Sequence, residues 1–126
     1  MDYGLNDNYG FCLLTRLRVG FSHLNEHKFR HNFLDTLDPF CACRTDSIEN
    51  TKHYLLQCPN YSIHRSKLFE DLHNIHISVL PYACDILIDI LLYGNSSLSK
   101  VVNRDILTAT INYIVPTRRF DIPLFN

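Results

Sequence analysis

Three cysteines and a histidine lie close together in the sequence, at spacings that suit a metal ion. Cys41 and Cys43 are separated by one residue, His53 follows after nine more residues, and Cys58 after a further four. Three thiolates and one imidazole form a soft, tetrahedral donor set, which suits Zn²⁺. Because protein atoms would fill all four coordination positions, the predicted ion is structural rather than catalytic. The alternative is that these are three ordinary buried cysteines and a surface histidine.

The elements on either side of a polar turn must bring these ligands to one point. In an extended arm, residues two apart point to the same side, so Cys41 and Cys43 can face one ion. His53 and Cys58 are five residues apart, which places them about 140° apart on a regular helix. The residue before a proline avoids the helical conformation, so Pro59 favours an extended Cys58 that can turn back toward His53. The sequence therefore predicts a zinc knuckle made of a small β-hairpin and a short helix.

Apolar residues at helical spacing predict a mainly α fold with five to six helices. The helices are expected at residues 11–19, 22–37, a short stretch that begins at Thr51, 61–75, 83–93 and 97–115. Ser22, Thr51 and Ser97 are the expected N-caps, and Pro116 is expected to end the last helix. The chain is expected to divide into a loose N-terminus (1–10), a helical zinc-binding module (11–76, with the zinc knuckle at 39–60) and a C-terminal helical pair with a tail (77–126).

Two further groups of residues have helical spacing. His23, His27 and His31 are spaced by four and would follow one side of a helix. A metal site, a basic face that meets phosphates and a solvated face without a partner all fit this pattern. Asp85 and Asp89 also lie four apart, which fits either a metal-binding carboxylate pair or an exposed stripe on a helix.

Composition places the chain among small globular proteins. It has 126 residues, of which 46% are hydrophobic and 20% charged, and a net charge of −1. Total charge therefore gives no argument for a nucleic-acid partner, although residues 11–69 carry eight Lys/Arg against five Asp/Glu. No apolar run reaches the roughly 18 to 20 residues that a membrane span needs, and the N-terminus has no secretory signal pattern. We expect an intracellular protein, nuclear or cytoplasmic, with no membrane partner.

Two runs of this sequence resemble the zinc-binding C-terminal region of non-LTR retrotransposon reverse transcriptases: LTRLRVGFSHLNEHKFRHNFLDTLDPFCAC and TKHYLLQCPNYSIHRSKLF. The features that carry the resemblance are Thr15 to Arg18, His23 to Arg30, Cys41, Cys43, His53, Cys58, Tyr61 and Arg65. It extends over nearly all of residues 11–125. Two positions depart from the family pattern: Arg44 stands where a glycine commonly follows the second cysteine, and Pro116 interrupts the final helix.

The resemblance implies a fragment of a polyprotein whose polymerase domain lies upstream and is the expected partner. The sequence contains no Asp-Asp pair, which a reverse transcriptase needs to hold its metal ions, so we expect no polymerase activity in this chain. The family role implies a zinc-stabilised, non-catalytic module that contacts RNA or DNA. The candidates for phosphate contact are Arg16, Arg18, Lys28, Arg30, Lys52 and Arg65, and those for base stacking are Tyr54 and Tyr61. The alternative is a decayed structural fragment that packs on the polymerase and binds nothing by itself.

Overall fold

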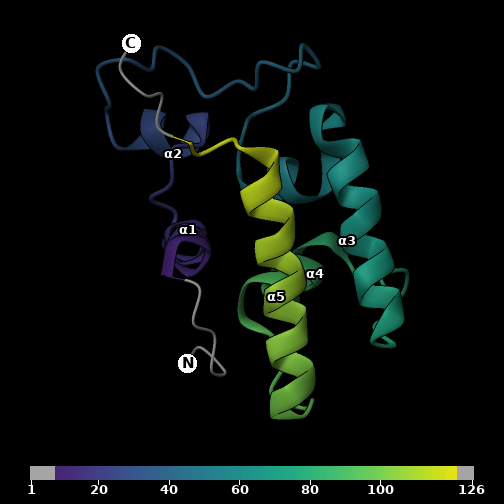
Figure 1. Ribbon diagram of the computed structural model, residues 1–126. Coiled ribbons are helices and arrows are strands. Elements are labelled where there is room, and N and C mark those ends of the chain that lie inside the picture. Colours follow the sequence, from purple (N-terminus) through teal and green to yellow (C-terminus); the bar gives the residue numbers. More distant parts are fainter. Residues whose placement is uncertain (1–7, 122–126) are drawn as a thin grey trace.

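Helices make up most of the computed structural model, which describes residues 8–121 (Figure 1). The α-helices are α1 (Asn8–Val19), α2 (Asn25–Arg30), α3 (Ser62–Asn74), α4 (Cys84–Tyr93) and α5 (Lys100–Thr117). A π-helix, η1, covers His53–Gln57, and a 3-10 turn, η2, covers Pro59–Tyr61. The predicted mainly α fold is confirmed. In place of the predicted hairpin, residues 8–121 contain an isolated antiparallel bridge between Phe40 and Ile48.

The longest helix, α5, is the centre of the fold. It packs against α1, α3 and α4, and Figure 1 shows it between α1 and α3, with α4 crossing behind it. One apolar core joins side chains from all four helices and from η1. Its largest fully buried members include Tyr54, Tyr113, Leu14, Leu68 and Leu91. Burying each such side chain contributes roughly 1.5 to 3 kcal/mol, so residues before and after position 76 stabilise one another through this core.

The ends of α5 differ slightly from those predicted. Its N-cap is Ser99 rather than Ser97, because the Ser99 hydroxyl accepts a hydrogen bond from the Val102 amide at 3.1 Å. Pro116 lies inside the last turn and does not end the helix. The helix ends one residue later, where Arg118 takes the left-handed conformation with a φ of +57°.

The helix predicted over residues 22–37 is much shorter in the structure. Only Asn25–Arg30 is helical, and the residues that follow form turns. Asn32 has a φ of +62°, a left-handed conformation that asparagine tolerates better than most residues. Leu34 and Leu37, which the helical spacing assigned to an apolar face, are therefore exposed. The prediction was wrong here because, within residues 8–121, no neighbouring element covers that face.

Two other expectations concern the chain ends and the membrane. The loose N-terminus expected at residues 1–10 falls mostly outside the described residues, and α1 already begins at Asn8. Among the helices of residues 8–121, none is both long enough and apolar enough to cross a membrane.

Candidate metal centre

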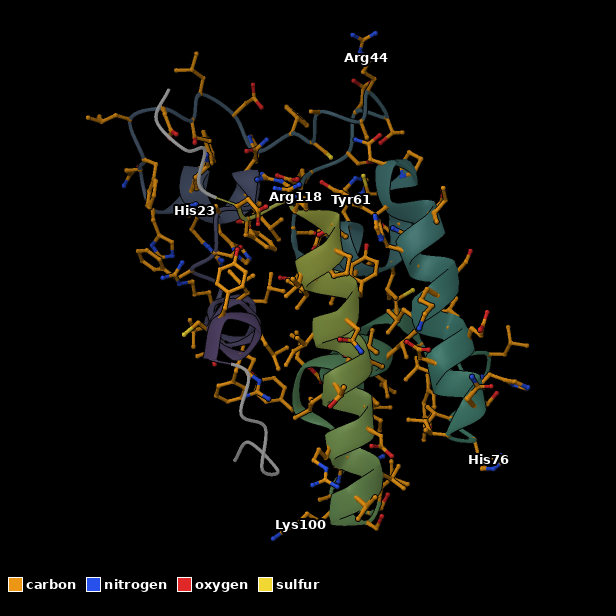
Figure 2. All side chains as sticks on the ribbon, in the orientation of Figure 1. His23, Arg44, Tyr61, His76, Lys100 and Arg118 are labelled. Atoms are coloured by element: carbon orange, nitrogen blue, oxygen red, sulfur yellow. The ribbon has the colours of Figure 1, made fainter. Side chains whose placement is uncertain are left out.

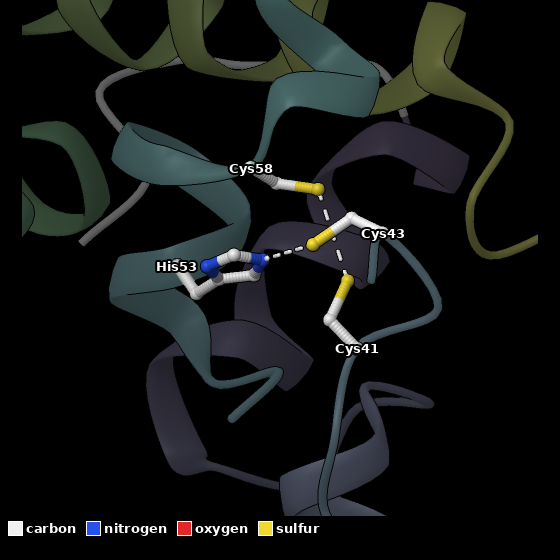
Figure 3. A group of neighbouring side chains, drawn as sticks. All are labelled: Cys41, Cys43, His53 and Cys58. Atoms are coloured by element: carbon white, nitrogen blue, oxygen red, sulfur yellow. Dashed lines mark hydrogen bonds between the residues drawn. The ribbon is translucent and has the colours of Figure 1, made fainter. Parts of the chain in front are cut away.

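The four predicted ligands converge on one point (Figure 3). One donor atom from each of Cys41, Cys43, His53 and Cys58 lies within 4.8 Å of the other three. The sulfurs of Cys41 and Cys58 are 3.7 Å apart, and Cys43 Sγ lies 3.4 Å from His53 Nε2. Around a tetrahedral zinc ion, the corresponding separations are about 3.8 Å for two sulfurs and about 3.6 Å for sulfur and nitrogen. The cluster can therefore hold a metal ion.

The surroundings of His53 separate this cluster from an ordinary set of core residues. The His53 side chain is buried, and its Nδ1 has no hydrogen-bond partner in the described part of the chain. Its Nε2 lies 3.4 Å from the Cys43 sulfur, which is a weak hydrogen-bonding group. Buried polar atoms are normally paired, so hydrogen bonding does not explain why this ring is buried here. A cation at Nε2 would give this buried ring one strong partner, with the proton on Nδ1.

A π-turn overcomes the five-residue spacing between His53 and Cys58. The Cys58 amide donates to the His53 carbonyl at 2.7 Å, the five-residue bond of η1. This wider turn brings the two side chains to one side of the helix. Cys58 is extended, with φ −66° and ψ 123°, which confirms the conformation predicted from Pro59. The Asn50 side-chain oxygen accepts from the His53 amide at 2.9 Å, so Asn50, and not Thr51 as predicted, caps this helical segment.

Side chains from α3 and α5 cap the carbonyl groups of this turn. Arg65 donates through Nε to the Leu55 carbonyl at 3.0 Å and through Nη2 to the Cys58 carbonyl at 2.7 Å. The Tyr113 hydroxyl donates to the Tyr54 carbonyl. Arg65 therefore stabilises the metal-binding turn. Because its guanidinium already donates to two carbonyls of that turn, Arg65 is poorly placed to meet a phosphate.

The arm that carries Cys41 and Cys43 turns back sharply. The Cys41 amide donates to the Ser47 carbonyl at 2.8 Å. Between them, Arg44 and Asp46 have φ values of +66° and +56°, in the region that favours glycine. The glycine that the resemblance associates with position 44 would adopt this conformation without strain.

The three thiols differ in acidity because their surroundings differ. Burial raises the pKa of Cys41 to about 12, and it also raises the pKa of Cys58. The Thr45 hydroxyl, 3.0 Å from Cys43 Sγ, lowers the pKa of Cys43 to about 6. Metal ligation requires thiolates, so an ion that enters this cluster displaces protons from Cys41 and Cys58.

An ion pair that the sequence did not reveal lies against the cluster. Buried Glu49 has its Oε2 3.9 Å from the Cys41 sulfur. Arg119 donates through Nη2 to Glu49 Oε1 at 2.6 Å and through Nε to Oε2 at 2.8 Å. It also donates to the His23 carbonyl at 3.0 Å, which ties the segment after α5 to the start of α2. Sequence spacing indicates contacts between near neighbours only, so no pattern pairs two residues 70 positions apart.

Four of the six basic candidates for phosphate contact engage other residues of the chain. Arg65 donates to the Leu55 and Cys58 carbonyls. Arg18 is half-buried, donates to the Leu92 carbonyl and lies over the rings of Phe11 and Tyr93. Lys28 pairs with Asp35 at 3.4 Å, and Arg30 pairs with Glu26 at 3.5 Å. Arg16 and Lys52 are exposed.

The tyrosine candidates for base stacking lie in or against the core. Tyr54 is fully buried, and its hydroxyl is 2.6 Å from Thr117 Oγ1. Tyr61 is half-buried and meets the Tyr54 ring edge-on, with centroids 5.2 Å apart. Tyr54 therefore has no exposed face on which a base could stack.

The three histidines at helical spacing do not converge. His27 is buried: its Nδ1 accepts from the Ser22 amide at 3.1 Å and lies 2.8 Å from the Ser22 hydroxyl. Burial lowers the pKa of His27. His23 and His31 are exposed. Ser22 therefore packs with His27 in the turn before α2 and does not cap a long helix.

The acidic pair lines an open groove of about 640 Å³ between α4 and the ends of α1 and α2. Asp85 and Asp89 share this groove with Arg18, Arg30 and Lys52. Among the residues that the structure describes, the cysteine–histidine cluster is the one group of three or more potential ligands that converges. Carboxylates repel phosphates, so Asp85 and Asp89 weaken the attraction of these cations for a nucleic-acid backbone.

No family model, curated protein or solved structure matches the chain significantly. The resemblance to retrotransposon reverse transcriptases therefore depends on the sequence motifs alone.

Proposed function

We propose that the chain is a zinc-stabilised, non-catalytic nucleic-acid-binding module from the C-terminal region of a non-LTR retrotransposon reverse transcriptase. The observation that carries the proposal is the convergence of three sulfurs and one imidazole nitrogen within 4.8 Å. Thiolate and imidazole ligands select zinc over magnesium and calcium, which prefer oxygen. Four protein ligands leave no coordination position for water or substrate, so the ion has a structural role.

The segment that carries the first two ligands has few apolar contacts to stabilise it. Within residues 38–49, only Cys41 and Glu49 are buried. Zinc binding in small finger-like sites contributes on the order of 10 to 16 kcal/mol at neutral pH, as much as the whole stability of a typical domain, roughly 5 to 15 kcal/mol. The ion, rather than an apolar core, therefore holds this segment in place.

Two exposed cations support nucleic-acid binding. Lys52 is exposed and directly precedes the ligand His53, so a bound ion would also fix the position of Lys52. Arg16 is exposed in the last turns of α1. Both can reach phosphate oxygens without breaking an ion pair within residues 8–121. The upstream polymerase domain implied by the resemblance would provide the remaining contacts.

Fluorescence anisotropy with a labelled single-stranded RNA or DNA, at several salt concentrations, tests this proposal. For single strands, the logarithm of the binding constant falls with the logarithm of salt concentration by about 0.7 for each phosphate contact. Arg16→Ala and Lys52→Ala should each weaken binding and reduce this slope by about one contact. Arg104→Ala, which removes an exposed charge from α5, is the matched control and should change neither. Absent or salt-insensitive binding contradicts the proposal.

A structural fragment that packs on the polymerase is the second candidate. Leu34 and Leu37 are 99% and 89% exposed, and a partner surface would remove both from water. This candidate predicts that zinc-loaded protein binds no oligonucleotide and self-associates. The double substitution Leu34→Ser with Leu37→Ser should then restore a monomer in analytical ultracentrifugation. A monomeric wild-type protein that binds oligonucleotides excludes it.

A further inference from the structure

Four rings meet in the turns that flank α2. Phe21 and His31 stack, with ring centroids 4.1 Å apart and planes at 30°. Phe33 meets Phe21 edge-on at 6.1 Å and His23 at 6.4 Å. These contacts join His31, Phe21, Phe33 and His23 into one group, which we name the ring cluster.

The ring cluster lies at the surface, where a ligand can reach it. Phe21 is 49% exposed, His23 and His31 are exposed, and Phe33 is half-buried. Figure 2 shows His23 beside α2, on the side of the molecule away from α3. Exposed rings that already stack on each other offer π faces on which a further flat ring can stack.

The end of α1 fixes the rings before any ligand arrives. Gly20 has a φ of +71°, and the Phe21 amide donates to the Arg16 carbonyl at 3.0 Å, so the chain turns sharply after the helix. The Gly20 carbonyl accepts from Arg30 Nη2 at 3.1 Å and from His31 Nε2 at 3.3 Å. A Cβ at position 20 would lie 2.7 Å from Arg30 Nη2, which is too close for a van der Waals contact. The hydrogen bond from Arg30 to the Gly20 carbonyl therefore favours glycine at this position. A surface that is already ordered loses less entropy on binding.

The charges near the ring cluster are mixed, and Arg16 is the nearby cation that forms no ion pair within residues 8–121. Partial loss of contact with water lowers the pKa of the otherwise exposed His23, and three nearby cations lower it further: Lys28, Arg16 and Arg119. One carboxylate, Asp35, acts in the opposite direction. A phosphate group is attracted to the charge of Arg16, while bases are attracted to the rings.

We infer that the ring cluster is the surface on which bases of a single-stranded nucleic acid stack, with Arg16 beside the phosphates. This inference rests on the proposed function and gives it a site. It assigns stacking to Phe21 and His31 in place of Tyr54, which is buried. Stacking requires unpaired bases, so the site takes single strands and not duplexes.

Binding of an oligonucleotide that contains 2-aminopurine, whose fluorescence is quenched on stacking, tests the inference. Phe21→Leu removes a ring but no charge, so affinity should fall between roughly 5- and 100-fold, quenching should decrease, and the salt slope should stay the same. Phe29→Leu is the matched control, because Phe29 is 45% exposed and makes no ring contact within residues 8–121. It should bind like the wild type.

The possible results separate this inference from the proposed function. A wild-type protein that binds no oligonucleotide overturns both. Salt-sensitive binding that Phe21→Leu leaves unchanged, or that Phe29→Leu weakens equally, overturns the ring cluster alone, as does a duplex bound as tightly as a single strand. Melting curves show whether Phe21→Leu is folded. If it is not, His23→Ala at the other end of the ring cluster provides the test and should reduce affinity and quenching.

Discussion

Replacing Arg119 by methionine removes one partner of a buried ion pair and leaves the other in place. The Glu49 side chain is 4% exposed and that of Arg119 is 23% exposed. The guanidinium donates to both carboxylate oxygens, at 2.6 and 2.8 Å. After the substitution, Glu49 keeps the Asn25 amide at 2.8 Å as a donor, but its charge stays buried 3.9 Å from the Cys41 sulfur.

Loss of one partner from a buried pair lowers the free energy of unfolding by about 3 to 5 kcal/mol. Against a typical total of roughly 5 to 15 kcal/mol, Arg119→Met is therefore a severe substitution. Glu49→Gln should have a smaller effect, because Arg119 is partly exposed and can reach water. The double substitution should be less harmful than Arg119→Met alone, since no buried charge remains. Zinc affinity should also fall in Arg119→Met, because the Cys41 thiolate then faces an uncompensated carboxylate.

Urea unfolding of zinc-loaded protein, followed by circular dichroism, measures the free energies, and competition with a chelator measures the metal affinity. Arg118→Met is the control. It removes the adjacent arginine, whose side chain is 80% exposed, and should leave the unfolding midpoint nearly unchanged. The reasoning is refuted if the effects of Glu49→Gln and Arg119→Met add, or if Arg118→Met is as harmful as Arg119→Met.

Three further predictions concern the knuckle. Arg44→Gly should raise the free energy of unfolding by up to about 1 kcal/mol in urea melts, because Arg44 has a φ of +66°, which glycine adopts without strain. Ala42 has no positive φ, so Ala42→Gly should lower the free energy of unfolding. Chelation or Cys58→Ser should speed amide hydrogen exchange over residues 38–60. Cys84→Ser, which replaces an exposed cysteine outside the cluster, should not. Unchanged exchange after chelation argues against the site. Burial raises the pKa of Cys41 to about 12 and also that of Cys58, from an ordinary value of 9.0, so the unfolded chain gives up these protons first and metal-stripped protein should lose stability as the pH rises above 9.0. The lowered pKa of Cys43, about 6, acts in the opposite direction only below that pH. Zinc-loaded protein, whose thiols carry no protons, should not show this loss, and identical pH profiles for the two forms would contradict the assignment.

The metal ligands could be predicted from the sequence because donor type and spacing are local properties. Cys41, Cys43, His53 and Cys58 converge as predicted, and Pro59 correctly indicated an extended Cys58. The π-turn that brings His53 and Cys58 together could not be predicted. It depends on carbonyl caps from Arg65 and Tyr113 on other helices, and sequence spacing does not report contacts over such separations.

Helix prediction was accurate where an apolar face is buried by neighbouring helices. The expected helices at 61–75 and 83–93 match α3 and α4 within one residue at each end. The helix expected over 22–37 has equally regular spacing, but no element in the described part of the chain covers its second half, and the chain leaves the helix after Arg30. Periodicity indicates where an apolar face would lie, and only tertiary packing decides whether the helix forms.

Basic residues were the least predictable part of the candidate function. Arg18 and Arg65 look like surface cations in the sequence, yet each donates to main-chain carbonyls inside the fold. Arg119 stood in a segment expected to be a tail, and it holds the buried carboxylate beside the metal cluster. The charge of an arginine is evident from sequence, whereas its partner depends on the whole fold.

The metal content of protein purified without added zinc, measured by plasma mass spectrometry, tests the central claim most directly. The account predicts about one zinc atom per chain in the wild type and in Cys84→Ser, and a loss of that zinc in Cys58→Ser. A correctly folded wild-type protein that carries no zinc and takes up none when zinc is added would contradict it.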